Sequence, residues 1–131
     1  MAKSTKCTLL HDNPSLDVNN LQSTGQTALH SASYKGHIEV VKLLLAHPAI
    51  KVNIQNLEGF TPFSLCCING KIAVARELLK DPRVNITLED NWGCTPLWGA
   101  SCYGERGIVE WLIASGKHLG DLGRKGGIPQ G

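Results

Sequence analysis

A fixed interval of 34 residues separates four kinds of landmark along this chain. Segments of similar sequence begin at Thr27, Thr61 and Thr95, each 34 residues after the one before. Three further series keep the same interval: Gly25, Gly59 and Gly93; Gly36, Gly70 and Gly104; Pro14, Pro48 and Pro82. A period of roughly 20 to 50 residues is typical of stacked supersecondary units that bury one another's apolar faces. The sequence therefore predicts an array whose long surface, rather than a pocket, carries its function.

Each unit of the array is predicted to hold two helices joined by a tight turn. In the second unit Thr61 can cap a helix, and Pro62 fills the first helical position, where no amide donor is needed. Gly70 ends this helix, because glycine tolerates the left-handed conformation past a helix C-terminus. An apolar stripe over residues 72–79 predicts a second, amphipathic helix, which stops before Pro82.

The first helix of every unit is predicted to approach its neighbours closely. One inward-facing position carries a small residue in each unit: Ala32, Cys66 and Ala100. Ser101 is expected to face inward beside the last of these. The third unit should be the loosest, because Arg106 stands where an apolar residue is expected and Gly107 follows it. We expect its second helix to start late.

Composition argues against several classes of protein. The formal net charge of +2 is mild and evenly spread, which argues against nucleic-acid binding. The five cysteines form no paired framework, so reduced thiols in the cytoplasm or nucleus are expected. No apolar run is long enough to span a bilayer, and no signal-peptide core stands at the N-terminus. We expect a soluble intracellular protein without membrane insertion.

The repeated unit resembles the ankyrin repeat. Residues 27–30 read Thr-Ala-Leu-His, residues 36–45 form the helical core of the unit, and Val52-Asn53 leads into a hairpin. The resemblance covers about residues 7–126. It implies an all-α ankyrin-repeat solenoid, built from stacked helix-turn-helix units with connecting hairpin loops.

Two repeats depart from the family pattern at one position. Ser64 and Trp98 stand where the first repeat has His30. The side-chain bond between threonine and histidine that the family often makes is therefore expected only at Thr27 and His30.

The repeat boundaries divide the chain into three parts. Residues 1–22 are expected to form the second helix and hairpin lead of a partial N-terminal repeat. Three full repeats should follow over residues 23–116, at about 23–56, 57–90 and 91–116. Residues 117–131 are expected to be part of a further repeat or a flexible tail. We interpret the chain as a segment of a longer array.

The resemblance implies binding of another protein through hairpin tips and the concave face of the first helices, as a scaffold or adaptor. Aromatic anchors gathered in a patch are common carriers of interface energy. The positions that the family would expose are Tyr34, Lys35, Leu57, Glu58, Phe60, Ile68, Asn69, Asn91, Trp92 and Tyr103. Packing of these rings against neighbouring hairpins is the structural alternative. End-to-end self-association of the array is a further alternative.

Two other functional classes remain open, namely a regulatory or targeting module of a larger enzyme and a structural spacer. No residues are predicted to be catalytic, because no nucleophile stands with both an orienting group and an oxyanion site. No metal site is predicted either, since paired Cys-x2–4-Cys or His-x3–5-His spacings are absent. No cofactor is implied.

The resemblance also points to a modification. Hairpin asparagines of the family can be hydroxylated by an asparaginyl hydroxylase, generally with a leucine eight residues upstream and an acidic residue two before. Asn53 has Leu45 at the first position and Lys51 at the second. Asn19 has Asp17 at the second position and no leucine at the first. Asn53 and Asn19 are therefore partial matches to a hydroxylation site.

Overall fold

The computed structural model of the chain describes residues 19, 21 and 25–119. This part of the chain holds six α-helices and no β-strand. The helices are α2 (Ala28–Lys35), α3 (Ile38–Leu45), α4 (Pro62–Ile68), α5 (Ile72–Lys80), α6 (Pro96–Cys102) and α7 (Arg106–Ala114). Most of the partial repeat expected over residues 1–22 and most of the tail expected over residues 117–131 lie outside the described residues.

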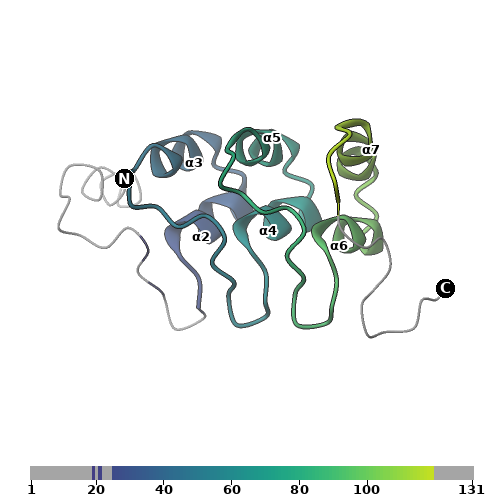
Figure 1. Cartoon of the computed structure of the whole chain (residues 1–131), viewed down its shortest axis with the longest axis horizontal. Helices are drawn as coiled ribbons and strands as arrows, with labels where there is room; N and C mark the ends of the chain where they lie inside the picture. Colours follow the sequence, from purple (N-terminus) through teal and green to yellow (C-terminus); the bar gives the residue numbers. More distant parts are fainter. Residues whose placement is uncertain (1–18, 20, 22–24, 120–131) are drawn as a thin grey trace.

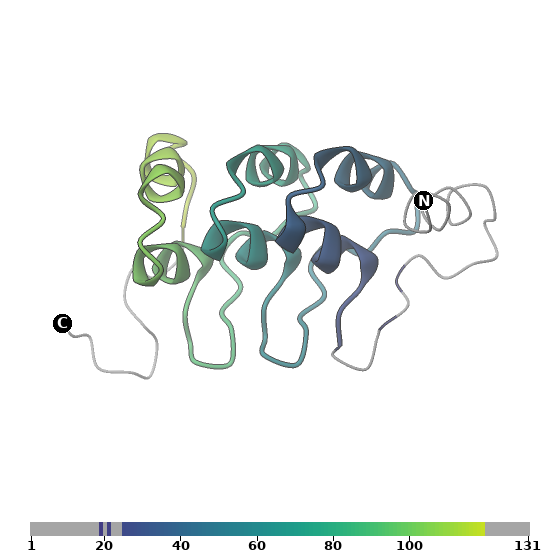
Figure 2. The ribbon, with the colours of Figure 1, turned by 180° about the vertical axis from the view of Figure 1, so that it is seen from behind.

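The six helices form two rows. Helices α2, α4 and α6 lie side by side in an inner row, and α3, α5 and α7 form an outer row (Figure 1). Two long loops that lie wholly within the described residues project from the inner row, and the view from behind shows the same order (Figure 2). We name them the second hairpin (residues 46–61, between α3 and α4) and the third hairpin (residues 81–95, between α5 and α6). The predicted all-α solenoid of stacked helix-turn-helix units is confirmed.

The repeated threonines begin the inner helices, as predicted. Thr61 Oγ1 accepts a hydrogen bond from Ser64 N at 3.1 Å, and Pro62 occupies the first helical position. Thr27 and Thr95 cap α2 and α6 in the same way. A threonine hydroxyl satisfies one of the amide donors that a helix N-terminus leaves unpaired. The sequence period therefore fixes where each inner helix starts.

The core lies between the two rows and between neighbouring inner helices. Phe63, Leu29, Leu78, Ile108 and Leu112 are among its largest fully buried side chains. The three small inward-facing residues of the inner helices are buried as well: Ala32, Cys66 and Ala100. Their predicted position is confirmed. A small side chain lets the helix axes approach and keeps the interior close-packed.

The second helix of the third unit does not start late, so that prediction was wrong. Helix α7 begins at Arg106, which is in register with Ile38 of α3 and Ile72 of α5. The turn before it sets this start, because Arg106 N donates to Gly104 O at 2.9 Å. The Arg106 side chain stays in solvent and pairs with Glu110 at 2.9 Å, one turn along the helix. A polar residue is therefore accommodated without delaying the helix.

Ser101 is exposed, so its predicted inward orientation was wrong. Its equivalents Ser33 and Cys67 are buried, and each stands on an inner helix that another inner helix follows. No described helix follows α6 in the inner row. Ser101 instead donates its hydroxyl to Leu97 O at 3.0 Å, one turn earlier in its own helix.

Candidate interaction surface

A side-chain acceptor shapes the tip of each described hairpin. Asn56 Oδ1 accepts hydrogen bonds from Glu58 N and Phe60 N, both at 2.9 Å. Asp90, 34 residues later, accepts from the amides two and four residues further along at 2.9 and 3.0 Å. The sequence analysis missed both residues. An Asn or Asp followed by glycine three positions later is a turn signal that would have found them.

The two tips are bonded to each other. Asn91 N donates to Glu58 O at 3.0 Å, and Asn91 Nδ2 donates to Leu57 O at 2.7 Å. Gln55 Nε2 donates to Glu89 O at 2.8 Å and so adds a third bond between the second and third hairpins. The tips therefore form one continuous edge of the molecule.

This close approach requires the glycine at position 59. Gly59 has a φ of +86°, a backbone conformation that residues with a side chain rarely adopt. A Cβ atom at this position would lie 2.6 Å from Asn91 N and 2.9 Å from the carbonyl carbon of Asp90. Both neighbours are backbone atoms that cannot rotate away. Glycine is therefore the residue that allows the third hairpin to pack against the second.

An apolar surface crosses the joined tips. The rings of Phe60 and Trp92 contact each other with centroids 6.1 Å apart and planes inclined by 33°. Phe60 is partly buried, whereas Trp92 is 51% exposed and Leu57 is 69% exposed. We call Leu57, Phe60 and Trp92 the tip patch. Large apolar side chains that are exposed to this extent often mark an interaction site.

A buried histidine is hydrogen-bonded to the backbone of Phe60, one residue of the tip patch. His30 Nε2 donates to Phe60 O at 2.9 Å, and His30 Nδ1 accepts from Thr27 N at 3.1 Å. Thr27 Oγ1 also lies 2.9 Å from His30 Nδ1, so the predicted bond between these side chains is confirmed. Burial lowers the pKa of His30 below its ordinary value, which keeps the ring neutral near pH 7.

Most of the residues predicted to be exposed are exposed. Seven of the ten are open to solvent: Tyr34, Lys35, Leu57, Glu58, Asn91, Trp92 and Tyr103. Phe60 and Asn69 are partly buried. Tyr34 and Tyr103 lie at the C-terminal ends of α2 and α6, on the inner row rather than on the hairpin tips.

Ile68 is the exception, because only 9% of it is exposed. A Cβ atom on Gly99 of α6 would lie 2.8 Å from Ile68 Cγ2, so the absence of a side chain at Gly99 makes room for the isoleucine. In α4 the position equivalent to Gly99 is occupied by Leu65. The expectation that Ile68 lines an open surface was wrong, because the burial of Ile68 depends on Gly99 in the next repeat.

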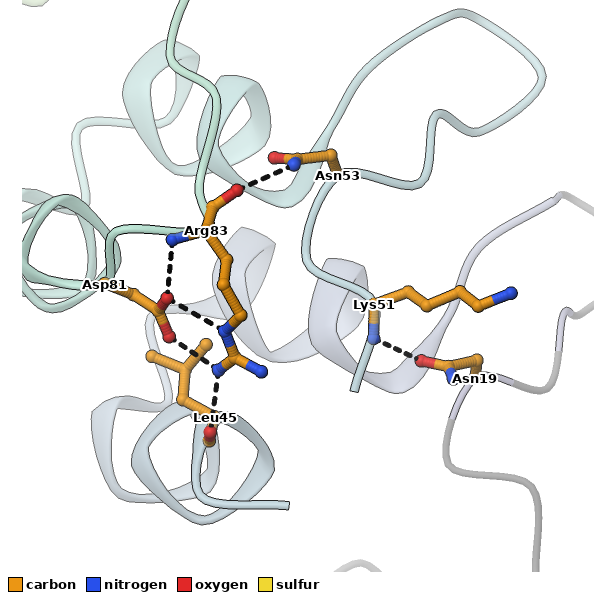
Figure 3. Close-up of polar contacts among 6 residues, drawn as sticks. All are labelled: Asn19, Leu45, Lys51, Asn53, Asp81 and Arg83. Carbon is orange, nitrogen blue, oxygen red and sulfur yellow. Dashed lines mark hydrogen bonds and ion pairs between the residues drawn. The ribbon is translucent and has the colours of Figure 1, made fainter. Parts of the chain in front are cut away.

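Asparagines at the hairpin bases connect successive repeats (Figure 3). Asn53 Nδ2 donates to Arg83 O at 2.9 Å, and Asn53 Oδ1 accepts from Asn85 N at 2.8 Å. One repeat earlier, the Asn19 carboxamide makes the same pair of bonds with residues 49–51, both at 2.8 Å. Both candidate hydroxylation sites therefore occupy equivalent places in one ladder of bonds between repeats.

Arg83 adds a further link between repeats (Figure 3). Its guanidinium donates to Asp81 through Nε at 2.9 Å and through Nη2 at 2.6 Å, and Nη2 also donates to Leu45 O at 3.0 Å. Leu45 is the last residue of α3, whose terminal carbonyls lack partners within the helix. The guanidinium lowers the pKa of the Asp81 carboxyl below its ordinary value. Arg83 therefore joins the end of α3 to the loop that follows α5.

Metal ligands, cysteine thiols and long apolar helices are three further features to consider among the described residues. No group of three or more His, Cys, Asp or Glu side chains in this part of the chain could hold a metal ion. Burial raises the pKa of the Cys66 thiol well above its usual value, which makes it a poor nucleophile. Among residues 19, 21 and 25–119, no helix is long and apolar enough to cross a membrane.

Comparison with protein families agrees with this architecture. A family model of ankyrin repeats in three copies matches residues 49–121, and a single ankyrin repeat model matches residues 24–57. The first match alone covers more than half of the chain, so the chain belongs to the ankyrin repeat family. Ankyrin repeats generally mediate protein–protein interactions and are typically non-catalytic. A search of curated proteins finds no match to this chain.

Proposed function

We propose that this chain binds a partner protein through the tip patch and the adjoining ends of the inner helices, as a scaffold or adaptor segment. The observation that carries the proposal is the exposure of Trp92 and Leu57 on two tips that are bonded together. An aromatic side chain that already packs against a neighbouring ring loses little conformational entropy on binding. Tryptophan is also enriched among residues that dominate interface energy. Tyr34 and Tyr103 extend the surface along the inner row.

The proposal treats the chain as a non-catalytic unit in the cytoplasm or nucleus. The thiol of Cys102 is exposed and not in a disulfide, which fits a reducing compartment. A regulatory or targeting role within a larger enzyme would use the same surface, with the chemistry supplied outside residues 1–131. A structural spacer would need no exposed aromatic edge.

A pull-down from eukaryotic lysate, read by mass spectrometry, tests the proposal. The test variant is Leu57→Ala/Trp92→Ala, which removes exposed atoms and leaves the partly buried Phe60 in place. The matched control is Leu43→Ala/Ile113→Ala, which removes apolar side chains of 46% and 62% exposure from the outer helices α3 and α7. All variants must first keep the helical circular dichroism of the wild type.

The proposal expects a protein that the wild type and the control capture and the test variant loses. Equal capture by all three would move the interaction to another face. An empty result would favour the spacer. Recovery of untagged copies of the same chain would support end-to-end self-association, and its dependence on the test or control variant would show which face makes the contact.

We further propose Asn53 and Asn19 as hydroxylation sites. The supporting observation is that both carboxamides occupy the same place in the ladder, each bonded to one carbonyl and one amide of the next repeat. A hydroxylase would need that segment released from the ladder, so modification should rise when the array is destabilised. Mass spectrometry of protein from a eukaryotic host tests this. Peptides of both sites without the mass of one added oxygen atom would rule it out.

A further inference from the structure

The tips that carry the apolar patch are acidic, so the expectation of an evenly spread charge was wrong. Residues 53–60 and 85–94 contain three carboxylates, Glu58, Glu89 and Asp90, and no lysine or arginine. These segments have a formal charge of −3 in a chain of net charge +2, so the remaining residues carry +5. The tips therefore attract positive charge, although the chain as a whole is slightly cationic.

Two of the three carboxylates are available to a ligand. Asp90 already accepts hydrogen bonds from two backbone amides of its own tip. The Glu58 carboxylate, which is exposed, and the Glu89 carboxylate, which is partly exposed, make no hydrogen bond or ion pair with the described residues. The nearest cation along the third hairpin, Arg83, is bonded to Asp81 and Leu45 at the base of the hairpin. Glu58 and Glu89 are thus acids without a cationic partner in this part of the molecule.

An exposed aromatic ring lies on the same joined tips as these acids. Glu58 O accepts the amide of Asn91 at 3.0 Å, and Asn91 immediately precedes Trp92. A lysine or arginine side chain that approaches Trp92 gains a cation–π contact, and tryptophan is the best aromatic residue for it. Leu57, on the neighbouring tip, supplies aliphatic contact for the side-chain stem or for an adjacent apolar residue. An acidic or phosphorylated segment would meet only repulsion here.

We propose that the tip patch takes a cationic segment of another protein, in which an arginine or lysine stands beside an apolar side chain. The cation lies against Trp92 within reach of Glu58 and Glu89, and the apolar neighbour covers Leu57. This inference rests on the proposed function and adds the chemistry of the partner to it. Charge complementarity at exposed positions sets the choice of partner and the association rate more than the total affinity.

A selection from a phage-displayed library of short random peptides tests the inference with the whole chain as bait. The affinities of individual selected peptides are then measured on three variants. Trp92→Ala removes the anchor, and Glu58→Gln/Glu89→Gln removes the two carboxylates without changing side-chain size. Glu39→Gln/Glu110→Gln is the matched control, because it changes the net charge equally but on the outer helices α3 and α7.

The expected result is a peptide set enriched in arginine or lysine next to apolar residues. Trp92→Ala should weaken these peptides by at least about 30-fold, as for a central aromatic anchor. Glu58→Gln/Glu89→Gln should weaken them by up to about fivefold for each carboxylate, the range of exposed ion pairs. The control should leave them within about twofold, since its carboxylates lie on another face.

Three results would overturn the inference. Peptides that depend on Trp92 but lack cationic enrichment and ignore Glu58→Gln/Glu89→Gln would leave the proposed function standing and remove the cationic partner. Cationic peptides that the control weakens equally would show attraction to overall charge only. A selection without any peptide that depends on Trp92 would overturn both the inference and the proposed function.

Discussion

The two described junctions between repeats are equivalent in sequence position but differ in chemistry. At the first junction, between α2 and α4, the buried His30 side chain donates to Phe60 O in the next repeat at 2.9 Å. At the second junction, between α4 and α6, Ser64 takes the place of the histidine and its hydroxyl bonds Thr61 at 3.1 Å. The second junction is closed by steric fit instead, with Ile68 against Gly99. At the inner helices, the register is therefore held by a polar bridge at the first junction and by packing at the second.

The hairpins repeat this contrast. A Cβ atom on Gly25 would lie 3.0 Å from Leu57 N at the first junction. A Cβ atom on Gly59, its equivalent, would lie 2.6 Å from Asn91 N at the second. The second junction is the tighter one at the tips, and it is the one that brings Phe60 against Trp92. The candidate binding surface is thus built on the junction whose hairpins approach more closely and are also joined by hydrogen bonds.

The largest effect on the free energy of unfolding is expected from alanine at Gly59, and alanine at Gly25 is the comparison. Gly25→Ala and Gly59→Ala share a left-handed backbone, with φ of +79° and +86°, which costs about 1–2 kcal/mol in each. Gly59→Ala should lose a further 1–3 kcal/mol or so, because its Cβ meets the backbone of Asn91. Chemical denaturation measures both. Equal losses would mean that the second junction is no tighter than the first.

The first junction should make stability depend on pH. Burial lowers the folded pKa of His30, so the unfolded chain binds a proton more readily than the folded one. The free energy of unfolding should be highest above the ordinary histidine pKa of about 6.5 and fall as the pH drops below it. The slope contributed by one group is at most about 1.4 kcal/mol per pH unit. A protonated Nδ1 can no longer accept the amide of Thr27.

Urea denaturation at several pH values checks this expectation. His30→Gln should flatten the decline between pH 7 and the acid range, at the expense of some stability. His37→Gln is the matched control, because His37 is exposed and makes no side-chain cap bond at the start of α3. A decline that persists unchanged in His30→Gln and vanishes in His37→Gln would place the pH sensitivity elsewhere.

At the second junction, alanine at Gly99 should lower or raise the stability depending on which residue occupies position 68. Gly99→Ala brings a Cβ to 2.8 Å from Ile68 Cγ2, and the overpacking should outweigh the gain in helix propensity, for a net loss of about 1 kcal/mol. In an Ile68→Ala background the clash is absent, so the same substitution should stabilise by about 1 kcal/mol. A double-mutant cycle measures the coupling. Additive effects would show that the two positions do not touch.

The smallest effect is expected outside both junctions. Gly107 lies in the first turn of α7, and a Cβ atom added there would have no neighbouring atom within 4 Å. Gly107→Ala should stabilise the protein by about 0.5 kcal/mol, because alanine loses less backbone entropy in a helix and meets no neighbour here. Thermal unfolding followed by circular dichroism is sufficient to detect it. Destabilisation would mean that α7 does not begin at Arg106.

The repeated elements could be predicted from the sequence, because their signals lie within one repeat. Thr61 and Pro62 start a helix by local capping alone, and an apolar stripe at helical spacing needs no knowledge of neighbours. Features that depend on the next repeat could not be predicted. Ile68 is buried because Gly99 stands opposite it. Arg106 fails to delay α7 because the preceding turn, rather than its own side chain, sets the helix start.

In the candidate site, too, features within one repeat could be predicted and contacts between repeats could not. The exposure of Leu57 and Trp92 was predicted from their positions in the repeat and is observed. The bonds that join the tips were not predicted, since they need the hairpins in register. The tips at Asn56 and Asp90 keep the 34-residue interval, as do the base asparagines Asn19 and Asn53. The interval alone does not show which groups of the second and third hairpins meet, and that becomes evident only when the two hairpins are seen side by side.

Amide hydrogen exchange of Asn91, measured by NMR on the whole chain, tests most directly whether the second and third hairpins act as one unit. Asn91 is an exposed residue at a hairpin tip, where exchange is ordinarily fast. Its amide donates to Glu58 O at 3.0 Å, so we predict protection comparable to that of the α4 and α6 amides. Exchange of Asn91 as fast as in an unstructured peptide would contradict the joined tips and the binding surface built on them.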